Sequence, residues 1–228
     1  MGVRVAPRGQ TCLMRLARVT GWVFLLLGLL GAGFIAYQFF WTDHQAASAS
    51  SQTIKQLEKH WARSSPSAVP EPAKGKAFAI IRIPRLGSNW QQPVIEGIDS
   101  PELARGVGHY PFTSMPGEIG NFAVAGHRVT HGHPFRELDR MEPGDLIGIT
   151  MGQKVYVYRT VARHIVTPKS VEVLAPVPFE LDAQPTVASM IISTCHPKFS
   201  ARQRMVLVAQ LQSTYPLEMA PAQLRPRP

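Results

Sequence analysis

The feature that most constrains this chain of 228 residues is a long apolar stretch near its beginning. From residue 19 to residue 42 no side chain is charged, and the sequence reads VTGWVFLLLGLLGAGFIAYQFFWT. A helix of this length extends about 36 Å, which is enough to cross the apolar core of a bilayer. Trp22, Tyr37 and Trp41 lie near its ends, where aromatic side chains are common in membrane spans. The stretch therefore predicts a transmembrane anchor over residues 19–41.

The charges that flank this stretch predict its orientation. Four arginines precede it and one acidic residue follows it: Arg4, Arg8, Arg15, Arg18 and Asp43. Because positively charged flanks stay in the cytoplasm, residues 1–18 are expected to be cytoplasmic and the rest of the chain extracellular, in a single-pass protein of the plasma membrane. A cleaved signal peptide is the alternative, since AASAS at residues 46–50 contains an A-x-A pattern. The apolar run is longer than a usual signal core, which favours the retained anchor.

Residues 42–76 have the composition of an extracellular stalk. Ile54, Leu57 and Trp61 recur at helical spacing in SSQTIKQLEKHWA, so a short amphipathic helix is expected, lying along the membrane surface. The following SSPSAVPEPAKGK contains three prolines, which end a helix and favour an extended linker.

Residues 77–214 are predicted to form one mostly β domain, and residues 215–228 a flexible Pro-rich tail. The β-like runs are FAIIRIP, NFAVAGH, DLIGITM, KVYVYRTVARHIV, VASMIIST and RMVLVAQL. PGD at residues 143–145 and MGQK at residues 151–154 are typical of turns, while PELARG and HPFRELDR look like single helical turns. So many short strands indicate a barrel or a sandwich, and the pattern alone does not choose between them.

Cysteine content and charge exclude several classes of protein. Cys12 and Cys195 lie on opposite sides of the predicted span, so they cannot pair, and Cys195 is expected to be a free thiol. The net charge of +9 includes the four arginines before the span. Without them the chain has 20 basic and 15 acidic residues. No basic stripe with interleaved aromatic residues is present, so we expect no nucleic-acid partner.

Three chemically active residues stand next to β-like runs. Cys195 ends one run, Arg204 opens the next, and His127 ends NFAVAGH. A nucleophile, a proton carrier and a fixed cation are what acyl transfer through a thioester requires. A buried structural thiol and a polar residue at a strand end are the plainer interpretations of Cys195 and His127. Arg202 competes with Arg204, because strand alternation puts both on one face if the strand begins early enough.

These motifs, in this order, resemble the sortase transpeptidases. More narrowly, TCHPKFSARQRM, GHYP and the preceding membrane span resemble the class E housekeeping sortases of actinobacteria, over residues 77–212. The resemblance implies an all-β fold, a closed eight-stranded barrel preceded by one transmembrane helix. It also implies Cys195 as the nucleophile, His127 as acid and base, and Arg204 as the oxyanion stabiliser.

The resemblance further implies a substrate and an acceptor. The enzyme would cleave an LAXTG or LPXTG sorting signal between Thr and Gly and transfer the protein to an amine of lipid II, the peptidoglycan precursor, although pilin polymerisation is also open. Tyr110 falls where the family lines the pocket for the second signal position, and its hydroxyl could bind an amide N–H that proline lacks. Ala125, Ser193 and Thr194 are placed near the groove, and Thr194 is equally well explained as a strand former.

Neither a cofactor nor a metal is expected. The sequence has no acidic cluster like the calcium site of some sortases. His127, His131 and His133 in GHRVTHGHP do not have the spacing of a zinc signature, and a metal would quench the thiolate. Two other functions remain open: an L,D-transpeptidase-like enzyme, whose SHGC-type motif is absent, and a non-enzymatic, membrane-tethered β-barrel that binds wall polymers.

Overall fold

The structure is a computed structural model that describes residues 8–63 and 72–227. It divides into two compact units, residues 1–41 and residues 42–228. The predicted extended linker falls largely on residues 64–71, which lie outside the described residues.

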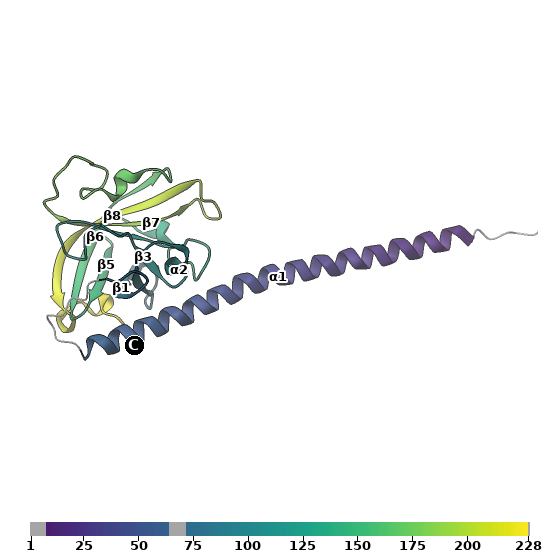
Figure 1. The fold of residues 1–228 in the computed structure, drawn as a ribbon, viewed down its shortest axis with the longest axis horizontal. Coiled ribbons are helices and arrows are strands. Elements are labelled where there is room, and N and C mark those ends of the chain that lie inside the picture. The colour runs from purple at the N-terminus through teal and green to yellow at the C-terminus, as the bar shows by residue number, and fades with distance from the viewer. Residues whose placement is uncertain (1–7, 64–71, 228) are drawn as a thin grey trace, which may run out of the picture. The chain divides into compact units, whose positions relative to one another are not determined.

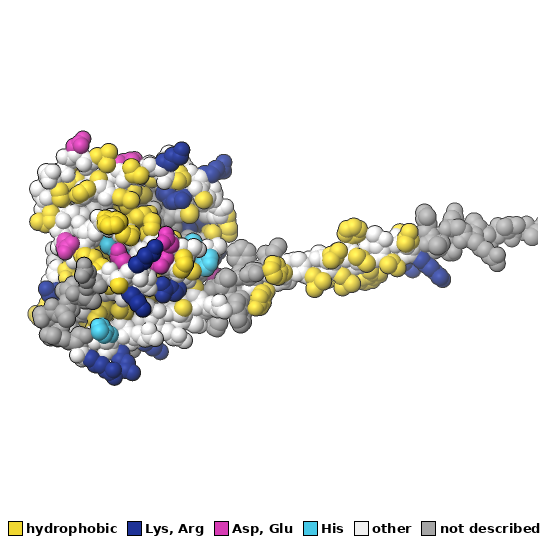
Figure 2. All heavy atoms as spheres, in the orientation of Figure 1, with side chains coloured by type: hydrophobic (Ala, Val, Ile, Leu, Met, Phe, Trp, Pro, Cys, Tyr) yellow, Lys and Arg dark blue, Asp and Glu magenta, His cyan; other side chains and the backbone are white. Residues whose placement is uncertain are grey.

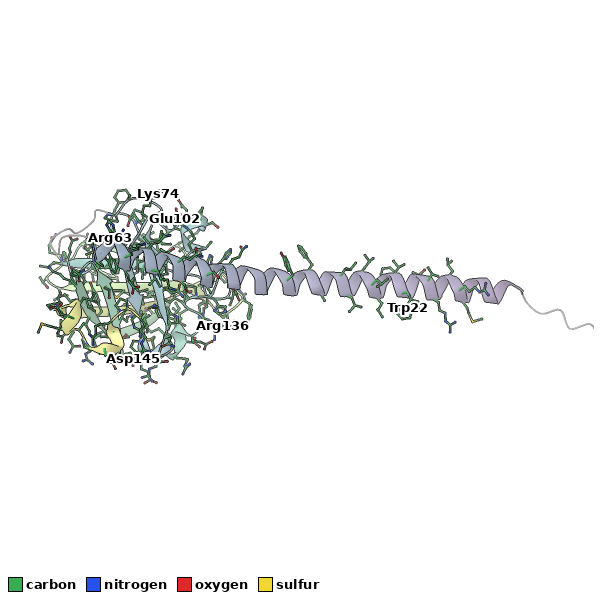
Figure 3. The ribbon with its side chains drawn as sticks, turned by 90° about the horizontal axis from the view of Figure 1, so that it is seen from below. Trp22, Arg63, Lys74, Glu102, Arg136 and Asp145 are labelled. Atoms are coloured by element: carbon green, nitrogen blue, oxygen red, sulfur yellow. The ribbon has the colours of Figure 1, made fainter. Side chains whose placement is uncertain are left out.

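The described part of the first unit is helical. Helix α1 is assigned from Arg8 to Trp61, and within it Met14–Phe34 is long and apolar enough to cross a membrane. Figure 2 shows apolar side chains along this stretch, and Trp22 projects from the helix surface in Figure 3, with 65% of its surface exposed. This stretch overlaps the expected anchor over residues 19–34, and the anchor's bounds of 19–41 stay a prediction.

The second unit is built on a closed barrel of eight strands (Figure 1). The strands are β1 Ala77–Arg82, β2 Gln91–Glu96, β3 Val107–His109, β4 Gly120–Ala125, β5 Leu146–Met151, β6 Lys154–Val166, β7 Ala188–His196 and β8 Gln203–Pro216. They close in the order β1-β2-β3-β4-β7-β8-β6-β5. The expected eight-stranded barrel is therefore confirmed.

Short helical turns join the strands. They are η1 Pro84–Leu86, α2 Ser100–Leu103, η2 Leu138–Arg140, η3 Val171–Leu174, η4 Leu217–Met219 and η5 Ala222–Leu224. Both predicted helical turns overlap with α2 and η2. The two predicted β-turns are also present, with Gly144 at φ +97° and Gly152 at φ +60°, conformations that favour glycine.

Strands β4 and β7 are buried on both faces. Phe122, Val124 and Ile192 point into the barrel core, whereas Ala123 and Ile191 belong to a second apolar cluster on the other side of the sheet. Because both faces are covered, these strands read as continuous apolar runs instead of alternating ones. This pattern is why they were visible in the sequence.

Strands β2 and β3 were not predicted. Pro93 lies within β2, and proline is rare inside strands because it lacks an N–H. Strand β3 has three residues, and its Gly108 lies so close to the backbone of Gly97 that an added Cβ would clash with the Gly97 carbonyl oxygen. Both strands depend on pairing with distant neighbours that a local pattern does not show.

The amphipathic helix of the stalk is present, but its expected position on the membrane surface is wrong. It is the last part of α1, and Ile54, Leu57 and Trp61 form a buried cluster with Ile80 of β1. Ile80 faces away from the barrel core, so it needs an apolar cover. Burying four such side chains stabilises this packing by several kcal/mol, at roughly 1.5–3 kcal/mol each.

The expectation of a loose tail is also wrong. Ala220 and Leu224 are buried against Val155 and Val157 of β6, and the Gln223 carbonyl accepts a hydrogen bond from Arg82 Nε at 3.1 Å. The tail has too few apolar residues to form a core of its own. The side of β6 that faces away from the barrel core supplies the missing partners, which the sequence of the tail alone does not show.

The packing of the tail can be tested with one cavity-forming substitution. Replacing Leu224 by Ala should lower the free energy of unfolding by about 2–4 kcal/mol, because the side chain is fully buried. Urea unfolding of the full chain in detergent, followed by tryptophan fluorescence, measures this change. Met219→Ala is the matched control, since Met219 is 70% exposed. Equal free energies of unfolding in the two variants would mean that the tail is loose after all.

Candidate active site

The pairing of β4 with β7 brings His127 and Cys195 to one edge of the sheet. The two strands are parallel, and Ala125 lies beside Ser193 at the end of their register. His127 and Cys195 each stand two residues beyond this pair. Because parallel strands end at the same edge, residues at equal offsets from a paired position lie close together.

Arg204 completes this group from the other side. In the antiparallel pairing of β7 with β8, Cys195 lies directly opposite Arg204 (strand positions in Figure 1). The guanidinium Nη1 donates to the carbonyl oxygens of Ala201 at 2.9 Å and Gln203 at 3.1 Å. These bonds hold the partly exposed guanidinium against the backbone just before Arg204, the residue that pairs with Cys195.

Arg202 does not share this position. It precedes β8, which begins at Gln203, and its side chain is exposed. Its backbone N–H donates to Ser200 Oγ at 3.3 Å, so it belongs to the turn before the strand. The choice of Arg204 over Arg202 is consistent with this geometry.

Four of the candidate residues share one face of the sheet. Ala125, Ser193, Cys195 and Arg204 occupy paired or alternate positions, so their side chains point to the same side. This is the side away from the barrel core, and it continues into the apolar cluster that includes Ala123, Ile191 and Val206. The face forms a surface that runs from an apolar region to the candidate nucleophile.

Tyr110 covers part of this surface. Its ring packs on the same cluster, and its hydroxyl hydrogen-bonds to Ser193. Burial raises the pKa of Tyr110, against the opposing effects of this hydrogen bond and of Arg204, so the phenol stays protonated at neutral pH. Both interpretations from the sequence therefore fit: Tyr110 is partly an apolar packing residue and partly a polar group beside Ser193.

Thr194 points the other way and joins the two strand ends. It is 2% exposed, and its hydroxyl donates to the Gly126 carbonyl oxygen at 2.8 Å. The Gly126 N–H in turn donates to the Ser193 carbonyl oxygen at 3.1 Å. With its hydroxyl already bonded, Thr194 is better placed to fix the segment before His127 than to contact a substrate, and its substrate-binding role stays a prediction.

His127 lies in an environment that disfavours its charged form. Burial and, second, the neighbouring His131 lower the pKa of His127 below its usual value, so the imidazole is neutral at pH 7. The two rings are stacked, with centroids 4.8 Å apart and planes 24° from parallel. Within the described residues, His127 Nε2 is buried without a hydrogen-bond partner, which leaves this nitrogen unpaired in the site.

Gly126 lets the side chain of Phe135 come close to the backbone before His127. A Cβ on Gly126 would stand 2.7 Å from the ring of Phe135, which is fully buried. The Phe135 N–H also donates to the His127 carbonyl oxygen at 3.1 Å. The glycine therefore lets the chain after His127 fold back onto the strand end.

Arg128 was missed by the sequence analysis. It is 3% exposed, and its Nη1 lies 3.3 Å from the Cys195 carbonyl oxygen and 3.0 Å from His196 Nδ1. Its Nη2 donates to Asp139 Oδ1 at 2.9 Å. One guanidinium thus ties the chain after His127 to the backbone of Cys195. The only signal in the sequence was a charged residue directly after an apolar strand.

The other two histidines of GHRVTHGHP, His131 and His133, have partners of their own. His131 stacks on His127, and His133 Nε2 lies 3.5 Å from Asp43 Oδ2. Among the residues that the structure describes, no group of three His, Cys, Asp or Glu side chains is placed to hold a metal. Independence from metals and cofactors stays a prediction.

Comparison with known proteins identifies the family of this fold. The family described as the sortase domain matches residues 81–212. Sortase SrtE1 of Streptomyces coelicolor is 37% identical over 210 residues, which cover 88% of this chain and 58% of that protein. This chain therefore spans less than two thirds of that relative's length.

Two solved structures share the fold. The structure of sortase E from Streptomyces avermitilis is 38% identical, with a TM-score of 0.61, and the match covers 67% of this chain and 99% of the other. Sortase E1 from Streptomyces coelicolor with a tripeptide in the active site is 35% identical, with a TM-score of 0.60, over 68% of this chain and 99% of the other. The chain belongs to the sortase family, whose members are cysteine transpeptidases.

The influence of His131 on His127 can be measured directly. His131→Asn should raise the pKa of His127, because it removes a like charge while the ring stays partly buried. NMR titration of the His127 ring protons, assigned by their loss in His127→Gln, gives the midpoint. His164→Asn should leave it unchanged, since His164 packs on Phe179 instead. An unchanged midpoint in His131→Asn would mean that burial alone sets the value.

The bridging role of Arg128 predicts a loss of stability. Arg128→Lys keeps the charge but cannot reach three acceptors, so it should lower the free energy of unfolding by about 1–3 kcal/mol, as unpaired buried polar groups do. Arg85→Lys is the matched control, because Arg85 pairs with Asp145 at 2.8 Å on the exposed surface, where solvent weakens the interaction. Urea unfolding compares the free energies of unfolding of Arg128→Lys and Arg85→Lys. Equal losses in the two variants would contradict the bridging role of Arg128.

Proposed function

We propose that this protein is a membrane-anchored sortase of the class E type, which cleaves a sorting signal between Thr and Gly and transfers the protein to an amine of the cell-wall precursor. The main observation in favour is the register of three strands, which sets His127 and Cys195 two residues beyond one parallel pair and Arg204 opposite Cys195. A nucleophile, a proton carrier and a cation at one sheet edge suit acyl transfer.

The proposed first half-reaction passes one proton through His127. The Cys195 thiol gives its proton to the neutral imidazole as the sulfur attacks the carbonyl carbon of Thr. The tetrahedral oxyanion lies near Arg204, and comparable donors contribute about 3 kcal/mol to such intermediates. The imidazolium then protonates the leaving amine of Gly as the C–N bond breaks, and a thioester remains on Cys195.

The second half-reaction returns the enzyme to its starting state. The acceptor amine attacks the thioester carbonyl carbon, and His127 takes the proton that this nitrogen loses. The C–S bond breaks, the new amide forms, and the sulfur regains the proton from His127. No cofactor or metal takes part in these steps.

Tyr110 supports the preference for an LAXTG signal over an LPXTG signal. Its protonated hydroxyl lies next to Ser193, on the same face as Cys195. A hydroxyl oxygen at this place can accept a hydrogen bond from the amide N–H of alanine at the second signal position, and proline has no such group. The related sortase E1 has been solved with a tripeptide in its active site, which agrees with a peptide-binding groove in this fold.

The location follows from the same proposal. Residues 1–18 would lie in the cytoplasm and the barrel outside the plasma membrane. Ala46 and Ser50, at the two ends of AASAS, are buried where the last part of α1 packs on the barrel, which favours a retained anchor over a cleaved signal. The acceptor would be lipid II, and wall anchoring is favoured over pilin polymerisation by the resemblance alone. An L,D-transpeptidase-like enzyme or a wall-binding barrel would need a different use of the sortase fold.

The decisive test is transpeptidation by the full chain in detergent. We expect cleavage of an LAXTG peptide with transfer to triglycine, detected by mass spectrometry, and less turnover of an LPXTG peptide. Cys195→Ala should abolish it, and Arg204→Ala should lower kcat/KM about 100–1000-fold, as the loss of an oxyanion donor does. Arg202→Ala, the exposed neighbour, should change it about twofold at most.

The outcomes separate the alternatives. Turnover without preference for alanine at the second signal position would support a transpeptidase but contradict the class E assignment. Turnover that survives Cys195→Ala would exclude the thioester route. Absence of both turnover and a covalent adduct at Cys195 would favour a non-enzymatic, wall-binding barrel.

A further inference from the structure

The turn that follows the candidate histidine has an unusual backbone. His131, Gly132 and His133 all have positive φ, at 52°, 72° and 37°. Residues other than glycine rarely adopt this conformation, because the Cβ atom crowds the backbone. Two histidines in it, on either side of a glycine, must therefore be held by contacts from elsewhere.

Asp43 makes those contacts from the helix. Its Oδ1 accepts a hydrogen bond from the Gly132 N–H at 2.9 Å, and its Oδ2 lies 3.5 Å from His133 Nε2. The helix also approaches the turn closely, since a Cβ on Gly132 would stand 3.1 Å from the Ala46 methyl group. One carboxylate thus binds two successive residues of the turn.

The helical segment that carries Asp43 is itself fixed to the barrel. Ser50 Oγ hydrogen-bonds to Gln92 Oε1 at 3.0 Å, and the Trp61 carbonyl oxygen accepts a hydrogen bond from Gln153 Nε2 at 3.1 Å. Ile54 and Leu57 are buried between these two points. The carboxylate is therefore presented from a docked element and not from a free chain end.

This turn also contacts His127. The ring of His131, the first residue of the turn, stacks on the ring of His127. We propose that Asp43 is a positioning residue: by fixing the turn, it holds His131 against His127 and so sets the geometry and the electrostatic surroundings of the proposed acid and base. This inference rests on the role proposed for His127.

Several charged or titratable groups surround His127. His131 and Arg128 lie on its own loop, Cys195 at the end of β7, and Arg204 opposite on β8. Of these, His131 is the group whose charge lowers the pKa of His127. Asp43 faces the turn from the helix, next to His133.

This arrangement makes the direction of the effect diagnostic. If Asp43 acts by position, its loss lets His131 move away, and the pKa of His127 rises towards its ordinary value. If Asp43 acted only through its negative charge, its loss would make nearby imidazolium less stable, and the pKa of His127 would fall. Position and charge therefore predict opposite shifts.

The experiment uses the full chain in lipid nanodiscs and three variants. Asp43→Ala should raise the NMR titration midpoint of the His127 ring and lower kcat about 3–10-fold with KM nearly unchanged, the size expected for loss of one hydrogen-bonded contact. Asp43→Asn keeps an oxygen that can accept from Gly132 N–H, and should restore most of both properties. Gln52→Ala changes an exposed side chain of the same helix, and should alter neither.

A double variant tests whether His131 carries the effect. In a His131→Asn background, Asp43→Ala should shift the His127 midpoint much less than it does alone. The proposal is overturned if Asp43→Ala leaves the midpoint unchanged or lowers it, or if Gln52→Ala raises it equally. The NMR readout does not depend on turnover, so failure of the transpeptidase proposal and failure of this one are distinguishable.

Discussion

The parallel pairing of β4 with β7 is the constraint on which the rest of the site depends. His127 and Cys195 are far apart in the sequence, and only this pairing gives them equal offsets from one register position. A shift of one residue would turn the side chains of β7 to the other face, so that Cys195 would point into the core. Burial of both strands on both faces makes such a shift costly. The apolar packing of the strands therefore fixes the position of the chemistry at their ends.

The strand ends are held by polar contacts that replace the missing sheet ladder. Thr194 binds the Gly126 carbonyl oxygen, and Arg128 reaches the Cys195 carbonyl oxygen and His196. Each contact joins the loop after β4 to the end of β7. Both side chains are buried, and a buried polar group without a hydrogen bond would destabilise the fold. The strand register places His127 and Cys195 approximately. The side-chain hydrogen bonds then limit the conformations of the backbone beyond the last hydrogen bond of the sheet.

The sequence predicted those parts whose signal is local. Strand runs such as VASMIIST, the turn at Gly144 and the candidate residues next to strand ends could all be read from neighbouring side chains. What it missed depends on partners far away: β2 despite Pro93, the tail through Leu224, and the helix that covers Ile80. Arg128 was missed for the same reason, since a charged residue after a strand is normally solvated and its burial between two segments has no local pattern.

The low pKa of His127 decides where the proton of the proposed reaction begins. Burial and, second, His131 favour the neutral ring. A neutral ring cannot protonate a leaving amine, so His127 must first receive a proton, and the attacking thiol of Cys195 is the nearby group that releases one. An imidazolium formed in this way is a stronger acid than an ordinary histidine, because its surroundings disfavour the charge. The environment that suppresses the charged form at rest therefore makes proton transfer to the amine easier once the attack has begun.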